Sequence, residues 1–372
     1  MEDRQARTVW IDYLRSFITV LVVAHHSSLA YTSFSTFSKP VYILSTHPVV
    51  DTERWAGLDV FVSFNDVFFM SLMFFISGLF VLPALRKKGA GTFLRDRFYR
   101  LFIPFFIGVT LLMLLAYYPA YCLSHDLPSI SGYIKDYFTT EAWPCGPPWF
   151  IWMLFLFNGV LALLYPFVGG LLDRVSARLA MLKNKPGLFF LAGWLITVIL
   201  YLPARWLFGA GTWTGIGPFD FQKSRVLLYF GYFVLGALMG NQKNGEGIFS
   251  EGSGIVKKWL LWLVGALVIY MLLMVTGNSL LYAASCVASS IAFITFFRKW
   301  IRTPRAWWNS LSANAYGIYL LHYIFVVWCQ YGLLGCSMPA PVKFSITFLV
   351  ALFASWLVSY AIRKNRIIGK YL

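Results

Sequence analysis

The sequence predicts an all-α protein, a polytopic integral membrane bundle of about ten transmembrane helices. Hydrophobic residues make up 59% of the 372 residues and charged residues only 12%, a balance that ordinary soluble domains do not show. Apolar stretches long enough to span a bilayer recur along the chain. Lysines and arginines gather in alternate connections between these stretches, as the positive-inside rule describes.

The expected spans are separated by short polar or basic connections, and one pair is divided only by the Gly277-Asn278 turn. The first span contains Asp12 and lacks a small-residue cleavage site, so we interpret it as a retained helix and not as a signal peptide. The ten expected spans are 10–33, 58–85, 101–122, 149–171, 187–208, 224–240, 259–276, 279–297, 312–335 and 341–362.

The basic residues orient this bundle. With both termini cytoplasmic, 24 of the 31 lysines and arginines fall inside and seven outside. The net charge of +16 is therefore mainly a topology signal facing anionic lipid headgroups, and we expect membrane lipids as neighbours but no nucleic-acid partner. Without internal repeats or linkers, the chain is expected to form one transmembrane domain over residues 1–372, with no soluble extra domain.

The expected outer loops combine carboxylates with aromatic rings, which suits a sugar-binding vestibule, because rings stack on sugars and carboxylates accept hydroxyl hydrogen bonds. The alternative is that the rings form an interfacial belt and the acids are ordinary solvated groups. The residues concerned are Asp51, Glu53, Asp59, Asp126, Asp136, Glu141 and Asp220, beside Trp55, Tyr133, Trp143, Trp213 and Phe219.

Cysteine and histidine spacing predicts no metal site and no bound cofactor, and no phosphate-binding glycine loop is present. Cys286 and Cys329 lie in expected helices and are typical small core residues. Cys122 and Cys145 flank an outer connection, where an oxidising periplasm permits a disulfide. The sequence leaves open whether they form one.

The first span carries a charged and a titratable residue on one face. Arg15 and His26 are eleven residues apart, which is three helical turns plus about 20° and a rise of roughly 16 Å. Ionisable groups in a membrane helix usually face a bundle interior or a wet cavity, which makes the pair a functional-site hypothesis. The alternative is that Arg15 snorkels to the interface and His26 is a hydrogen-bonded packing residue.

Two further groups of residues are candidates for ligand binding or catalysis. Arg97 and Arg100 are neighbours on a helix start, and adjacent guanidinium groups bind phosphates well, although the positive-inside effect alone could place them there. Near the end of the chain Tyr319 and His322 share one helix face, with Ala315 on the same stripe. The alternative for this face is a polar patch that joins helices.

Together these motifs resemble the membrane acyltransferase-3 family over about residues 8 to 365. Each motif is weak alone, but their order and spacing are specific. They are Ile11-Asp12-Tyr13-Leu14-Arg15 followed by ten residues and His26, Phe74-Phe75-Ile76-Ser77-Gly78, Arg97-x-x-Arg100 leading to Pro104, Pro148-Trp149-Phe150, and Tyr316-Gly-Ile-Tyr319-Leu-Leu-His322.

The resemblance is strongest to the glucan biosynthesis protein C type branch, which is associated with succinylation of periplasmic glucans. It implies a multi-pass enzyme of the bacterial inner membrane that moves an acyl group from cytoplasmic acyl-CoA, its co-substrate, to a glycan hydroxyl outside. Some relatives carry an SGNH domain, and none is expected here. Ser71 and Met73 stand where related sequences often have Pro and Phe, a departure that concerns the acceptor and not the chemistry.

Carried over to this sequence, the resemblance makes His26 the catalytic histidine, Arg15 its motif partner, and Arg97 and Arg100 the acyl-CoA-binding pair. From the residues themselves, Asp12 is one turn from Arg15 and would steady it, and His26 would take the proton of the acceptor hydroxyl. Candidate pocket residues are Ser77, Trp149, Tyr319 and His322, of which Ser77, Trp149 and Tyr319 are also candidate oxyanion donors.

The rival functional class is a transporter or flippase for an anionic glycan or lipid, in which the same residues line a pathway. Transport favours repeats and helix pairs broken by glycine or proline, which the sequence lacks. A scaffold with structural charges would require many coincidences of motif order. The sequence leaves open whether the acyl group is acetyl or succinyl, which acceptor is used, whether an acyl-enzyme forms, and the oligomeric state.

Overall fold

The computed structural model describes residues 2–242 and 247–365, and nearly all regular structure in them is helical. The elements are α1 (Glu2–Leu29), η1 (Lys39–Leu44), α2 (Ala56–Gly78), α3 (Val81–Lys88), α4 (Ala90–Arg97), η2 (Phe98–Phe102), α5 (Ile103–Ile107), η3 (Gly108–Leu112), α6 (Met113–Ser124), α7 (Ile130–Phe138), α8 (Trp149–Ala180), η4 (Met181–Asn184), α9 (Pro186–Phe208), β1 (Trp213–Thr214), β2 (Phe221–Gln222), α10 (Val226–Gly240), α11 (Gly254–Lys257), α12 (Trp259–Thr276), α13 (Ser279–Trp300), α14 (Ala306–Leu333) and α15 (Ala340–Arg363).

Eight helical stretches of the described chain are long and apolar enough to cross a membrane. The two other expected spans are helical as well. α1 carries Asp12, Arg15 and two histidines, and α10 has only 15 residues. The all-helical membrane architecture is confirmed, whereas the count of ten spans and the cytoplasmic side of the termini stay predictions.

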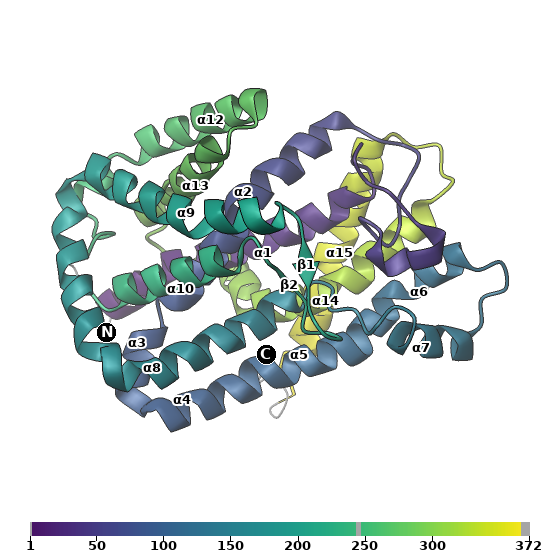
Figure 1. The fold of residues 1–372 in the computed structure, drawn as a ribbon, viewed down its shortest axis with the longest axis horizontal. Coiled ribbons are helices and arrows are strands. Elements are labelled where there is room, and N and C mark those ends of the chain that lie inside the picture. The colour runs from purple at the N-terminus through teal and green to yellow at the C-terminus, as the bar shows by residue number, and fades with distance from the viewer. Residues whose placement is uncertain (1, 243–246, 366–372) are drawn as a thin grey trace.

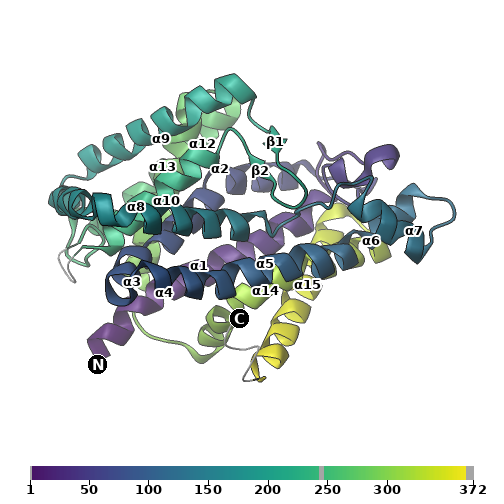
Figure 2. The same ribbon diagram turned by 60° about the horizontal axis from the view of Figure 1, so that its bottom comes forward.

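α1 lies at the centre of the bundle, in contact with α2, α13, α14 and α15 (Figure 1). α9, α12 and α13 group together on one side of α1, and the long helix from α4 to α6 lies on another side (Figure 2). This position surrounds the polar face of α1 with protein, so that its ionisable residues need not face lipid.

α2 and α10 pack at very short range, and glycine is required at their contact. A Cβ atom on Gly78 would lie 2.1 Å from the carbonyl oxygen of Phe233, and one on Gly236 would lie 2.0 Å from that of Phe75. The glycine of the Phe-Phe-Ile-Ser-Gly stretch is therefore a packing residue.

The helix from α4 to α6 contains two π turns, η2 and η3, and is joined to α14 through two carbonyls that lie four residues before prolines. Pro104 has no N–H to donate at this point of the helix, and the Tyr316 hydroxyl donates to the Arg100 carbonyl at 2.8 Å. Farther along, the Trp328 indole donates to the Leu115 carbonyl, four residues before the next proline, at 2.9 Å. These bonds fix the arginine-bearing segment against α14.

The outer-vestibule hypothesis is wrong for several of its residues. Asp51 is 3% exposed and accepts a hydrogen bond from Lys343 at 2.7 Å, so it anchors the 33–55 loop to α15. Tyr133 is buried and donates to the Leu114 carbonyl. Glu141, by contrast, lines an outer-loop cavity together with Asp136, and burial raises the pKa of its carboxyl. Asp51 and Tyr133 therefore hold parts of the fold together and do not face an open vestibule.

Candidate active site

Two cavities lie end to end inside the bundle. The first, called the arginine cavity, has a volume of about 420 Å³ and is lined by Arg15, Thr19, Met73, Ser77, Arg97, Arg100, Leu101, Phe150, Ile151, Leu154, Ser312, Ala313, Ala315, Tyr316, Tyr319 and Arg363. The second, called the histidine cavity, has a volume of about 510 Å³ and is lined by Val22, His25, His26, Leu29, Phe34, Thr46, Val62, Ser63, Asp66, Phe69, Met70, Pro147, Trp149, Trp213, Gln222, Arg225, Tyr229 and Tyr319.

Only a thin layer of side chains separates the cavities. Along α1 the lining passes from Thr19 to Val22, a rise of about 4.5 Å, and along α2 it passes from Met73 to Met70 over the same distance. Tyr319 lines both cavities. A group that crosses this layer therefore travels about one helical turn.

The arginine cavity has a strongly cationic wall. Arg15 pairs with Asp12 at 3.2 Å, in the arrangement that the sequence predicts for these two residues. The guanidinium of Arg97 lies 4.9 Å from the ring centre of Phe93, which orients it, and Arg100 lies on the adjoining π turn η2. No carboxylate lines this cavity among the described residues, and Ser77 adds a hydroxyl. The cavity is therefore suited to an anion with several charges.

His26 of α1 meets His322 of α14. Nδ1 of His26 lies 2.8 Å from Nε2 of His322, and the rings stack with their centres 5.1 Å apart. His322 is fully buried and lies behind His26, whereas His26 lines the histidine cavity. Tyr319 lies one turn before His322 and lines both cavities. The two residues that share this helix face therefore have different surroundings: Tyr319 lines the cavities, and His322 contacts His26.

The backbone fixes the tautomers of both rings. Carbonyl oxygens only accept hydrogen bonds, so Nδ1 of His322, 2.7 Å from the Tyr319 carbonyl, carries a proton. In neutral His322, Nε2 is then an acceptor, and Nδ1 of His26 donates to it. The Nε2 lone pair of neutral His26 is left available for a proton. A histidine in this state is a general base.

A further set of bonds holds the end of α1 in place. The Gln330 amide donates to the carbonyls of His26 and Ser27 at 3.2 and 3.1 Å. Its oxygen therefore accepts from Nε2 of His47, at 2.6 Å, on the 33–55 loop. Burial lowers the pKa of His47 to about 4, so this ring is neutral at pH 7.

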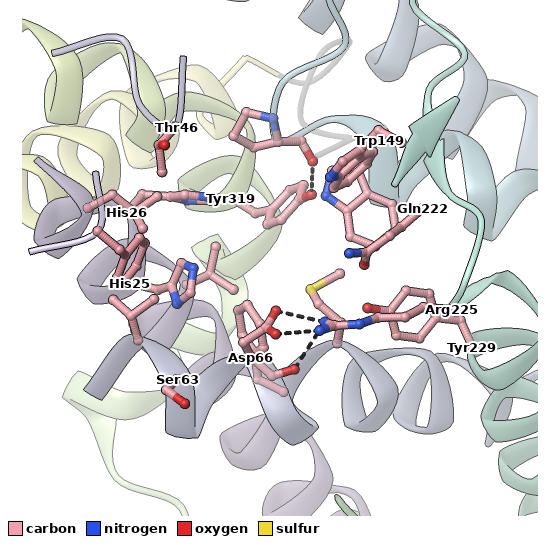
Figure 3. Close-up of a pocket in the computed structure, with 18 residues that line it drawn as sticks. His25, His26, Thr46, Ser63, Asp66, Trp149, Gln222, Arg225, Tyr229 and Tyr319 are labelled. Atoms are coloured by element: carbon pink, nitrogen blue, oxygen red, sulfur yellow. Dashed lines mark hydrogen bonds and ion pairs between the residues drawn. The ribbon is translucent and has the colours of Figure 1, made fainter. Parts of the chain in front are cut away.

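Sequence reasoning missed an ion pair in the wall of the histidine cavity. Two guanidinium nitrogens of Arg225 donate to the two carboxylate oxygens of Asp66 at 2.7 and 2.5 Å. Asp66 lies between His25 and Arg225 (Figure 3). The signal that could have found it is an acid in the middle of an apolar span. His25 also lines this cavity, and its Nδ1 has no partner among the described residues.

Aromatic residues complete the cavity. Trp149, which the sequence selects, stands against Trp213 of β1 with ring centres 5.5 Å apart in an edge-to-face arrangement. The Tyr319 hydroxyl donates to the Pro147 carbonyl (Figure 3). Of the aromatic residues proposed for the outer vestibule, Trp213 alone lines this cavity within the described chain.

The predicted site residues thus divide between two cavities. Arg15, Ser77, Arg97 and Arg100 line one, and His26 and Trp149 line the other. Tyr319 lines both, while His322 supports His26 from behind. Cys122 and Cys145 are free thiols in the structure.

The comparisons with known proteins define the class of protein to which this chain belongs. The chain matches the acyltransferase-3 family model, described as an acyltransferase domain, over residues 8–363. It therefore belongs to this family, and the apolar helices make it a multi-pass membrane acyltransferase. No curated protein and no solved structure matches the chain significantly.

Proposed function

We propose that this protein is a transmembrane O-acyltransferase of the bacterial inner membrane, which moves an acetyl or succinyl group from cytoplasmic acyl-CoA to a hydroxyl of a periplasmic or cell-surface glycan. The observation that carries the proposal is the pair of cavities that share Tyr319, one lined by arginines and the other containing His26. The arginine cavity opens to the cytoplasm in this proposal, because basic residues mark that side.

The dimensions agree with delivery of the thioester to His26. Arg97 and Arg100 bind the nucleotide phosphates, with Arg15 beside them. The phosphopantetheine arm, on the order of 15 to 20 Å, is comparable to the rise of about 16 Å from Arg15 to His26. The thioester carbon thereby passes the layer between the cavities and reaches the depth of His26.

The transfer is a single displacement. Nε2 of His26 takes the proton of the acceptor hydroxyl while the hydroxyl oxygen bonds to the thioester carbon. The C–S bond then breaks, and the CoA thiolate receives the proton from His26, so the products are the ester and free CoA. The Trp149 indole N–H is the preferred oxyanion donor, because the Tyr319 hydroxyl already donates to the Pro147 carbonyl.

The histidine cavity supports a polyhydroxylated acceptor. Its indole and phenol rings, Trp149, Trp213 and Tyr229, offer faces for sugar C–H surfaces. The Asp66 carboxylate, 44% exposed, retains lone pairs for acceptor hydroxyls although Arg225 binds both of its oxygens.

The test uses vesicles with the purified protein, acyl-CoA supplied only to the cytoplasmic face and glycan acceptor only to the outer face. We expect acylated acceptor outside and free CoA on the side of addition. Acceptor that crosses the membrane unmodified, with CoA release no faster than in protein-free vesicles, would refute the enzyme and favour a transporter. Mass spectrometry of envelope glycans from strains with and without the protein identifies the acyl group and the acceptor.

A further inference from the structure

Arg363 joins the arginine cavity from a helix that carries none of the motifs. It is the last residue of α15 and lines the cavity together with Arg97 and Arg100. One of its guanidinium nitrogens donates to the carbonyl of Ala313, which lines the same cavity. This bond holds the side chain toward the cavity and leaves its other N–H donors available.

The arginines of the cavity come from separate parts of the chain. Arg97 and Arg100 come from adjoining turns and are neighbours, whereas Arg363 reaches the cavity from α15. Both groups are attached to one segment of α14: Tyr316 donates to the Arg100 carbonyl at 2.8 Å, and Arg363 donates to the carbonyl of Ala313. A ligand with phosphates at two separate points matches this arrangement.

We propose that Arg363 binds the 3′-phosphate of CoA, while Arg97 and Arg100 bind the diphosphate. The inference rests on the proposed function and adds to it a specificity for the 3′-phosphate of the acyl donor. CoA carries both phosphate groups, whereas a phosphopantetheine arm on a carrier protein carries a single phosphate and would leave Arg363 unpartnered. The donor is therefore free acyl-CoA, and a nucleotide without the 3′-phosphate is discriminated against.

Calorimetric titration of the purified full-length protein with CoA and with 3′-dephospho-CoA tests this assignment. Wild type should bind CoA on the order of tenfold or more tightly than 3′-dephospho-CoA, as a charge-assisted hydrogen bond allows. In Arg363→Gln the affinity for CoA should fall to that for 3′-dephospho-CoA, which should itself change less than about twofold. Arg363→Lys should retain part of the discrimination.

Two matched variants control the measurement. Lys364→Gln removes the same charge one residue away, where the ammonium lies over the Tyr360 ring and outside the cavity lining, and it should retain the wild-type ratio. Arg97→Gln should weaken both nucleotides while keeping their ratio. If Arg363→Gln weakens both equally or changes neither, the assignment of Arg363 is wrong and acyl-CoA binding stands. If wild type binds neither nucleotide, the proposed function fails with it.

Discussion

Nδ1 of His26 donates a hydrogen bond to Nε2 of His322 across 2.8 Å, although the two residues are 296 positions apart. Because the Tyr319 carbonyl holds the proton of His322 on Nδ1, the direction of the bond between the rings is determined by the backbone. His322 therefore prepares His26 as a base and stabilises the imidazolium that forms when His26 accepts a proton.

Replacement of His26 by Gln should lower the rate of acyl transfer about 10²- to 10⁴-fold, because the general base is lost. The acylation rate of a glycan acceptor, measured by mass spectrometry, checks this. His25→Gln is the matched control, since His25 lines the same cavity without the bond to His322. Near-normal transfer by the His26 variant would show that another group is the base.

Replacement of His322 by Leu should lower kcat and leave both KM values within about twofold, because the residue acts through His26 and contacts neither substrate. His322→Gln, whose amide oxygen can accept from His26, should recover part of kcat. The same steady-state kinetics compare both variants. Equal loss in the two variants, or a change confined to KM, would contradict the positioning role.

Tyr316→Phe should destabilise the protein by about 1 kcal/mol, because it removes the donor to the Arg100 carbonyl. In a Pro104→Ala background the cost should nearly vanish, since the new N–H at position 104 can donate to the same oxygen. Denaturant titration in detergent of the four proteins gives the coupling energy. Additive effects would show that the hydroxyl does not replace the missing helical bond.

The pH dependence of the protein's stability should include a contribution from the titration of His47. Burial holds the pKa of His47 at about 4, below its usual 6.5, so the unfolded chain binds more protons between these values. Its contribution is complete above about pH 6.5 and is lost as the pH falls toward 4. His47→Gln, which keeps an N–H donor for Gln330, should reduce the fall in melting temperature over this range. A fall as steep as in wild type would exclude His47.

The sequence by itself determined the fold class and the identity of several cavity residues. Hydrophobic run length predicts membrane helices because bilayer thickness is fixed, and helical periodicity placed Arg15 and His26 on one stripe. The arginine pair, Trp149 and Tyr319 could be predicted from the sequence for the same reason, since motif spacing along one helix is a local property.

Only the tertiary structure decided what these residues meet. It placed Arg15 and His26 in different cavities, brought His322 to His26, paired Asp66 with Arg225, and buried Asp51 against Lys343. Each of these relationships joins residues on different helices. Side-chain periodicity specifies which face of a helix is polar, but helix packing selects the partner of that face, and packing depends on contacts distributed over the whole bundle.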